Sequence, residues 1–130
     1  MNPTPQKLLI IDDDQFLLNM YSLKFKNSGF EVETANSAPN ALQKLRDGFI
    51  PTVMLCDLVM PAMDGIEFIK RVKEESLAPA AAIMVLTNQN QSAEIERAKE
   101  LSVDGYIVKA STIPSEVVEE VKKILNKHSK

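Results

Sequence analysis

A chain of 130 residues in which 45% are hydrophobic and 25% charged has the composition of one soluble globular domain. Its formal net charge of −3 argues against a nucleic-acid-binding surface, and its single cysteine, Cys56, excludes an intramolecular disulfide. The apolar run after Lys7 is too short for a signal sequence or a membrane span, so we expect a cytoplasmic protein.

The sequence predicts one domain over residues 7–127. Residues 1–6 are expected to form a disordered polar lead-in, and residues 128–130 a frayed tail. The only histidine, His128, falls in that tail, which argues against a catalytic triad or a histidine-based metal site.

Short segments with strand propensity alternate with longer amphipathic segments. The first, third and fourth of these short segments are almost continuously apolar, as is typical of strands covered on both faces, whereas the second is polar enough for a sheet edge. The predicted strands are KLLII (7–11), EVETA (31–35), TVMLC (52–56), AIMVL (82–86) and GYIVK (105–109).

Helical patterns follow each predicted strand. The first, from Gln15 to about Asn27, is expected to bury Phe16 or Leu17 together with Met20 and Leu23. The later helices place apolar residues at helical spacing on one side. The second helix is expected to begin at the N-cap Ser37, with Pro39 in its first turn, and to run to Gly48. The third is expected to follow Asp64, and the fourth and fifth to span about 91–102 and 113–127.

A strand followed by a helix, repeated five times, predicts a doubly wound α/β fold. Its parallel sheet would have right-handed crossovers and helices on both faces. In such sheets, sites form beyond the carboxyl ends of the strands, where the strand order reverses. The residues that end each strand are therefore the candidates for chemistry.

Carboxylates, a hydroxyl and an ammonium group end four of the predicted strands. The first strand leads into Asp12, Asp13 and Asp14, the third into Asp57, the fourth into Thr87 and the fifth into Lys109. Three adjacent carboxylates repel one another, so we expect a cation among them. This set of groups suits phosphoryl transfer to a carboxylate, which needs a divalent cation to hold two negative partners together.

The residue types suggest a role for each group. Asp57 would be the nucleophile, Asp13 and Asp57 would bind Mg²⁺ directly, and Asp12 would act through water. Lys109 would pair with phosphoryl oxygens, and Thr87 would donate a hydrogen bond to one of them. Asp14 is expected to cap the first helix.

Four motifs, LLIIDDDQF, LCDLVMPAMDG, VLTNQ and DGYIVK, give the chain a family resemblance over residues 7–126. In this order they resemble the receiver domain of two-component response regulators. The resemblance implies the flavodoxin-like strand order 2-1-3-4-5. It also implies that a histidine kinase or a histidine phosphotransfer protein phosphorylates Asp57.

The resemblance assigns further roles. Asp12 and Asp13 would be the acidic pair, Val59 would offer its backbone carbonyl to Mg²⁺, and Lys109 would bind the phosphoryl group. Thr87 would be the switch hydroxyl and Tyr106 the aromatic switch residue.

The sequence departs from the family pattern at three places. Ala110 follows Lys109 where the family usually has a proline joined by a cis peptide bond, and we expect a trans bond here. Asn88, in place of a small residue, is expected to narrow access to the site. Val59, which cannot orient an attacking water, and the neighbouring variable residue Gln89 predict a long-lived phosphoryl group and slow self-dephosphorylation.

The sequence ends with the predicted fifth helix, so we expect a single-domain switch without an output module. It would act through a partner that docks on the fourth helix, the fifth strand and the fifth helix, or by relaying the phosphoryl group. Phosphorylation would draw in Thr87 and let Tyr106 rotate inward, with residues 87–92 as the mobile segment. The chain is expected to be a monomer, with dimerisation on phosphorylation left open.

Three other functions remain as alternatives. A haloacid-dehalogenase-like phosphatase would use Asp12 as nucleophile and Asp14 as its second aspartate, but the chain lacks the acidic pair after Lys109 and a substrate-binding cap. A flavodoxin-like cofactor carrier would need hydroxyls and amides after the first strand, where this chain has carboxylates. The third alternative is a receiver-shaped docking module that is never phosphorylated.

Overall fold

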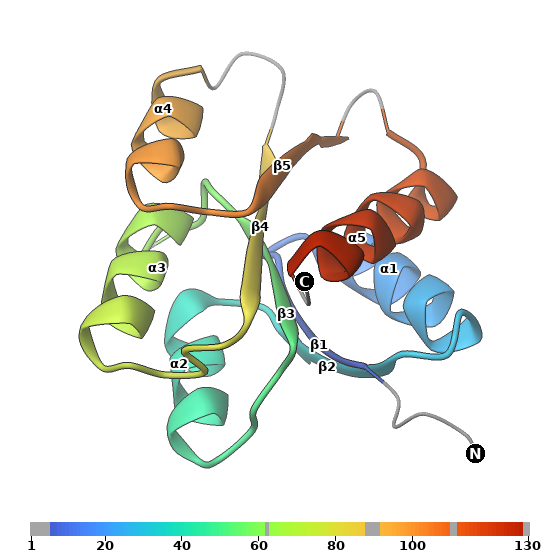
Figure 1. Cartoon of the computed structure of the whole chain (residues 1–130), viewed down its shortest axis with the longest axis horizontal. Helices are drawn as coiled ribbons and strands as arrows, with labels where there is room; N and C mark the ends of the chain where they lie inside the picture. The colour runs from blue at the N-terminus through green and yellow to red at the C-terminus, as the bar shows by residue number, and fades with distance from the viewer. Residues whose placement is uncertain (1–5, 62, 88–91, 110–111, 129–130) are drawn as a thin grey trace.

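The computed structural model describes residues 6–61, 63–87, 92–109 and 112–128. Within these residues, five parallel strands form one sheet in the order β2-β1-β3-β4-β5 (Figure 1). The strands are β1 (Lys7–Ile11), β2 (Glu31–Ala35), β3 (Val53–Asp57), β4 (Ala82–Thr87) and β5 (Gly105–Val108). The helices are α1 (Gln15–Asn27), α2 (Ala38–Arg46), α3 (Gly65–Glu74), α4 (Ser92–Glu100) and α5 (Pro114–His128). The predicted doubly wound α/β fold and its strand order are confirmed.

Helices cover both faces of the sheet. In Figure 1, α1 and α5 lie on one side, and α2, α3 and α4 lie on the other. Successive strand residues point to opposite faces, so Leu8 and Ile10 pack toward α1 and α5, while Leu9 and Ile11 pack toward α2 and α3. The three strands in the middle of the sheet are therefore apolar at almost every position, with polar residues only at their ends, as the sequence predicted.

The element boundaries differ from the predicted ones by a residue in several places. β3 runs one residue later than expected because Asp57 still pairs with Leu86 in the ladder. The carbonyl of Gln6 accepts a hydrogen bond from Glu31 N–H at 2.9 Å, so order begins within the expected lead-in. α5 continues through His128, beyond the predicted domain limit at residue 127.

The predicted buried face of α1 is only partly right. Leu17 and Met20 are half-buried, and Leu17 packs against the core, but Phe16 is 73% and Leu23 63% exposed. The fully buried residues of the helix are Leu18, Tyr21 and Phe25. α1 carries two apolar stripes, and packing selects the one with the larger aromatic area. The Phe25 ring meets Phe30 edge-on, with a centroid separation of 5.1 Å, which fixes the end of the helix against the start of β2.

The ends of the helices follow the sequence signals. The Asp14 carboxylate accepts hydrogen bonds from the first turn of α1, and Ser37 caps α2 in the same way. Gly29 adopts a φ of +94° just after α1, a conformation in which glycine is favoured. No helix among the described residues is both long enough and apolar enough to cross a membrane.

Some sequence predictions lie outside the described residues. They concern residues 1–5, Asn88 and Gln89, most of the 87–92 segment, the Lys109–Ala110 peptide bond, the side chain of His128 and residues 129–130.

Candidate functional site

Two carboxylates and an ammonium group meet where the strand order reverses. Asp12 follows β1 and Asp57 ends β3, and these two strands are neighbours at the switch point of the sheet. Asp12 alternates with Leu8 and Ile10, and Asp57 with Leu55, so both side chains stand on the face covered by α1 and α5.

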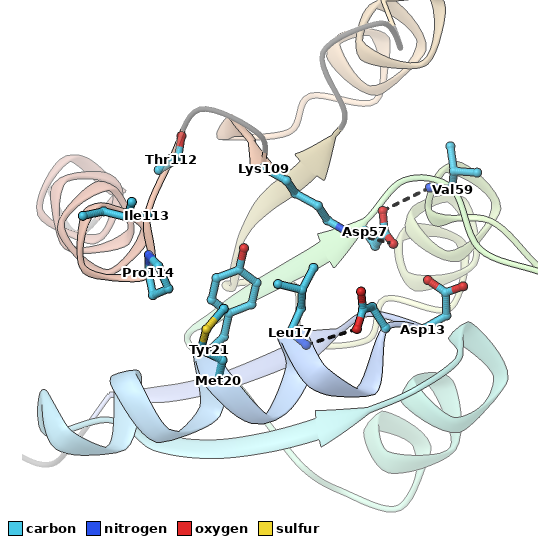
Figure 2. A pocket seen from close by; sticks show the side chains of 11 residues that line it. Asp13, Leu17, Met20, Tyr21, Asp57, Val59, Lys109, Thr112, Ile113 and Pro114 are labelled. Atoms are coloured by element: carbon cyan, nitrogen blue, oxygen red, sulfur yellow. Dashed lines mark hydrogen bonds and ion pairs between the residues drawn. The ribbon is translucent and has the colours of Figure 1, made fainter.

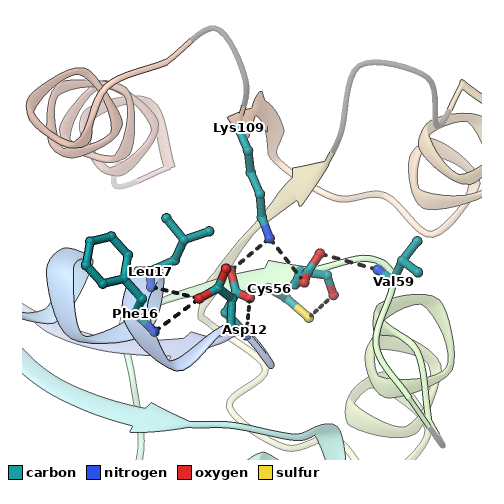
Figure 3. A network of polar contacts seen from close by, with 8 residues as sticks. Asp12, Phe16, Leu17, Cys56, Val59 and Lys109 are labelled. Atoms are coloured by element: carbon teal, nitrogen blue, oxygen red, sulfur yellow. Dashed lines mark hydrogen bonds and ion pairs between the residues drawn. The ribbon is translucent and has the colours of Figure 1, made fainter.

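Lys109 bridges the two carboxylates (Figure 3). Its Nζ lies 2.9 Å from Asp12 Oδ2 and 3.2 Å from Asp57 Oδ2. Burial favours a lower pKa for Lys109, but the two carboxylates outweigh it and the net pKa is raised. Lys109 is therefore a firmly charged group that lies within the acidic cluster.

Asp57 is a buried carboxylate with a strongly shifted pKa. Its Oδ1 accepts a hydrogen bond of 3.4 Å from Val59 N–H. Burial raises the pKa of Asp57 from 3.8 to about 7; Lys109 opposes the rise and Asp12 adds to it. In the metal-free protein, Asp57 is thus only partly ionised near neutral pH.

The three consecutive aspartates serve different purposes, which explains how they can be neighbours. Asp12 is fully buried, and its Oδ1 accepts a hydrogen bond of 2.9 Å from Asp14 N–H. Asp13 is exposed at the rim of the site. Asp14 Oδ1 accepts from the N–H groups of Phe16 and Leu17, so its charge faces the positive end of α1.

The acidic residues fit a cation. Asp12, Asp13 and Asp57 each offer an oxygen, and these oxygens lie within 4.8 Å of one another. Opposite ligands of Mg²⁺ stand about 4.2 Å apart, so a small movement or an intervening water completes such a site. The buried Asp12 Oδ2 has Lys109 Nζ, at 2.9 Å, as its only partner among the described residues. This cluster is able to bind a metal.

A pocket of about 750 Å³ opens in front of Asp57 (Figure 2). The carboxylates and Lys109 line one end, and apolar side chains from α1 and from the segment leading into α5 line the other. The apolar end is formed by Leu17, Met20, Tyr21, Ile113 and Pro114. A phosphoryl group and part of its donor fit this volume.

Tyr21 is a pocket residue that the sequence analysis missed. It is buried, and burial raises the pKa of its hydroxyl group. An aromatic residue in the middle of an amphipathic helix carries no sequence signal that separates a pocket wall from a core residue.

Thr87 and Tyr106 lie on the opposite face of the sheet from the carboxylates. Thr87 alternates with Ile83 and Val85, which pack toward α3 and α4. Tyr106 precedes Ile107, which belongs to the core under α1 and α5, so the ring of Tyr106 stands on the α4 side. Thr87 is buried, whereas Tyr106 is 49% exposed.

Gly65 is required by close packing and not by a left-handed backbone conformation, since its φ is not positive. A Cβ on Gly65 would overlap the Asp57 carbonyl oxygen and the Leu58 Cα, and Gly65 N–H donates to the Leu58 carbonyl at 2.8 Å. The absence of a side chain lets α3 start directly against the end of β3.

Fold and site together define a doubly wound α/β protein with a candidate cation site at its switch point. The family model for the response regulator receiver domain matches residues 8–122. The chain therefore belongs to this family, whose members accept a phosphoryl group in two-component signalling.

Individual proteins agree with this assignment. The chain is 34% identical to the transcriptional regulatory protein CpxR homolog of Haemophilus influenzae over 93% of its own length and 51% of that protein. Among solved structures, it is similar to a CheY-like receiver domain protein from Methanospirillum hungatei, with TM-score 0.86, 26% identity, and 97% and 98% of the two chains covered. It is also similar to the chemotaxis protein CheY4 of Vibrio cholerae, with TM-score 0.84, 28% identity, and 93% and 99% covered. The chain spans about half the length of the curated relatives it matches.

The substitution Asp57→Asn is expected to stabilise the metal-free protein, and more so at pH 8 than at pH 5. The stability that protonated Asp57 contributes is complete below pH 3.8 and is lost as pH rises through about 7. Asparagine does not ionise, so the variant avoids this loss. We expect its advantage in unfolding free energy to grow by about 1–3 kcal/mol between pH 5 and pH 8, measured by urea unfolding in EDTA.

A matched control is Asp47→Asn, since Asp47 is an exposed carboxylate just after α2 whose Oδ1 accepts a hydrogen bond from Gln43 Nε2. Its effect on stability should be small, because substitutions at exposed positions of this kind change the free energy of unfolding little. An advantage of Asp57→Asn that shrinks toward pH 8 would contradict the raised pKa.

Proposed function

We propose that this chain is a phosphorylation switch in which Asp57 accepts a phosphoryl group from a histidine kinase or a histidine phosphotransfer protein. The observation that carries the proposal is the buried Asp57 carboxylate, paired with Lys109 on one oxygen and facing a pocket beside two further carboxylates. Cytoplasmic location is part of the same proposal, because the donor proteins phosphorylate their receivers there.

Mg²⁺ is the proposed cation, held by Asp12, Asp13 and Asp57 with the backbone carbonyl of Val59. When bound, it supplies positive charge that keeps Asp57 ionised and offsets the repulsion between the nucleophile and the phosphoryl oxygens. The donor set of hard carboxylate oxygens and the burial of Asp12, whose Oδ2 is held by Lys109 alone among the described residues, support this assignment.

The proposed reaction is an in-line displacement at phosphorus. An Asp57 oxygen forms the new P–O bond while the P–N bond of the donor phosphohistidine breaks, and the imidazole nitrogen leaves with the bonding electrons. Lys109 is within reach of the incoming group, and its ammonium would move from Asp57 to a phosphoryl oxygen. Thr87 would donate its hydroxyl hydrogen to another phosphoryl oxygen.

The proposed output follows from Thr87 and Tyr106, which share the α4 side of the sheet. Movement of Thr87 toward the phosphoryl group would favour an inward Tyr106 ring and alter the surface of α4, β5 and α5. A downstream protein would read this surface. Signalling by a partner, not turnover of a substrate, is the proposed role of the chain.

The surroundings of the pocket support a protein donor. Phe16, Val59 and Ile113 are large hydrophobic residues left exposed near its rim, on α1, on the segment after β3 and on the segment before α5. Exposed apolar groups around a polar centre are typical of a protein-binding surface. The apolar stripe of α1 that packing leaves outside is thus part of the proposed donor interface.

Acetyl phosphate with Mg²⁺ is expected to add one phosphoryl group to the wild type and none to Asp57→Asn. The acyl P–O bond replaces the P–N bond, so the reaction needs only the site itself. Intact mass measures the uptake, and omission of Mg²⁺ should abolish it. If wild type and variant stay equally unmodified, the chain is a docking module instead; if both are modified, another residue accepts the group.

The phosphoryl group on Asp57 is expected to survive for minutes or longer at neutral pH with Mg²⁺. Val59 stands beside Asp57 with an exposed side chain that has no atom able to orient an attacking water. Val59→Asn should shorten the lifetime by about tenfold, the range of general catalytic positioning effects, whereas Val59→Ala should not. The lifetime is measured by mass spectrometry after the phosphoryl donor has been removed. Loss of the phosphoryl group from the wild type within seconds would contradict the predicted lifetime.

Phe16→Ala is expected to slow phosphotransfer from an autophosphorylated histidine kinase by about tenfold, since an exposed interface aromatic contributes roughly 1–2 kcal/mol. Uptake from acetyl phosphate and the urea midpoint should stay nearly the same, because the Phe16 side chain is 73% exposed. Leu42→Ala, in the buried core, would instead lower stability and serves as the contrasting variant. Equal kinase rates for Phe16→Ala and wild type would exclude this face from the donor interface.

A further inference from the structure

A cation–π contact joins α4 to β5 on the face that carries the switch residues. Lys99, in the last turn of α4, places its Nζ 5.4 Å from the centroid of the Tyr106 ring. This lies inside the separation of about 6 Å within which an ammonium group and an aromatic ring attract each other. The contact requires the Tyr106 ring to lie outward, as it does here with 49% exposure.

Lys99 has a second partner on its own helix. Glu96 Oε1 lies 3.5 Å from Lys99 Nζ, one turn earlier on α4. This pair keeps the ammonium group on the side of α4 where it meets the ring. Without the ring, an exposed pair of this kind contributes little to stability.

We propose that Lys99 is a positioning residue that holds Tyr106 in its outward position and thereby opposes activation of the switch. The inference rests on the proposed function, in which phosphorylation favours an inward Tyr106 ring. Turning the ring inward carries it away from Lys99 and breaks the cation–π contact. A phosphoryl group at Asp57 must therefore overcome this contact as well as the ordinary cost of the rearrangement.

The expected size of the effect follows from the exposure of the contact. Cation–π pairs at exposed sites favour the paired state by a factor of about two to five. Since binding of a phosphoryl mimic is linked to the inward state, loss of Lys99 should tighten apparent binding of the mimic by the same factor.

The sign of the effect separates this role from simple electrostatics. Lys99 is also a positive charge, and its removal makes the protein less attractive to an anion. A purely electrostatic role predicts weaker binding of the anionic mimic after Lys99→Gln, whereas the positioning role predicts tighter binding. A role limited to stabilising the C-terminal end of α4 would change the free energy of unfolding but not the affinity for the mimic.

The composition of the chain offers a direct readout. It has two tyrosines, Tyr21 and Tyr106, and no tryptophan, so labelling with 3-fluorotyrosine gives one ¹⁹F signal at the pocket and one at the switch. Tyr106→Phe assigns the signals. Titration with beryllofluoride and Mg²⁺, as a mimic of the phosphoryl group, then yields a midpoint for each variant.

Lys99→Gln is expected to lower the beryllofluoride midpoint by about two- to fivefold. Its free Tyr106 signal should also move toward the saturated position. Lys99→Arg keeps the cation over the ring and should leave the midpoint near that of the wild type. Lys123→Gln is the matched control, because Lys123 pairs with Glu120 at 3.5 Å with the same i,i+3 spacing, on α5, and should have no effect.

The double variant tests whether Lys99 acts through the ring. In a Tyr106→Leu background, followed through the Tyr21 signal, Lys99→Gln should no longer lower the midpoint. An unchanged or raised midpoint for Lys99→Gln alone, or an equal fall in the Tyr106→Leu background, would overturn the inference while leaving the proposed function standing. A wild-type protein that takes up no beryllofluoride would overturn the proposed function and this inference with it.

Discussion

The shared ammonium group of Lys109 is the interaction on which the site depends. Asp12 and Asp57 are buried side by side at the end of the two neighbouring strands, and two such carboxylates repel each other strongly. Lys109 reaches across from the end of β5 and lies within 3.2 Å of both. The chain thereby joins an edge strand to the switch point of the sheet, and this bridge keeps the acidic centre folded when no metal is bound.

This arrangement exchanges stability for reactivity. The burial that raises the pKa of Asp57 is the same burial that removes water from its oxygens, and a less solvated carboxylate is a better nucleophile once a cation restores its charge. A hydrophobic pair at these two positions would pack at lower cost. The site is therefore a local departure from the apolar core formed by the preceding residues of β1 and β3, against which it packs.

The sequence was most informative where local rules act alone. Strand alternation, the Asp14 and Ser37 caps and the residues ending each strand depend on near neighbours in the chain, and these predictions agree with the structure. The buried face of α1 was only partly predicted because Phe16 and Phe25 belong to competing stripes, and packing against Phe30 favours Phe25. The Gly65 contact with the end of β3 and the Lys99 contact with Tyr106 join separate elements, so no local pattern predicts them.

The alternation of side chains along the strands separates the chemistry from the surface that would report it. Asp12 and Asp57 share their face with α1 and α5, while Thr87 and Tyr106 stand on the opposite face, where the Tyr106 ring meets Lys99 of α4. A protein that delivers the phosphoryl group and a protein that senses it would thus meet different sides of one molecule. The two contact surfaces would adjoin only at α5, so most of each is free to diverge without disturbing its counterpart.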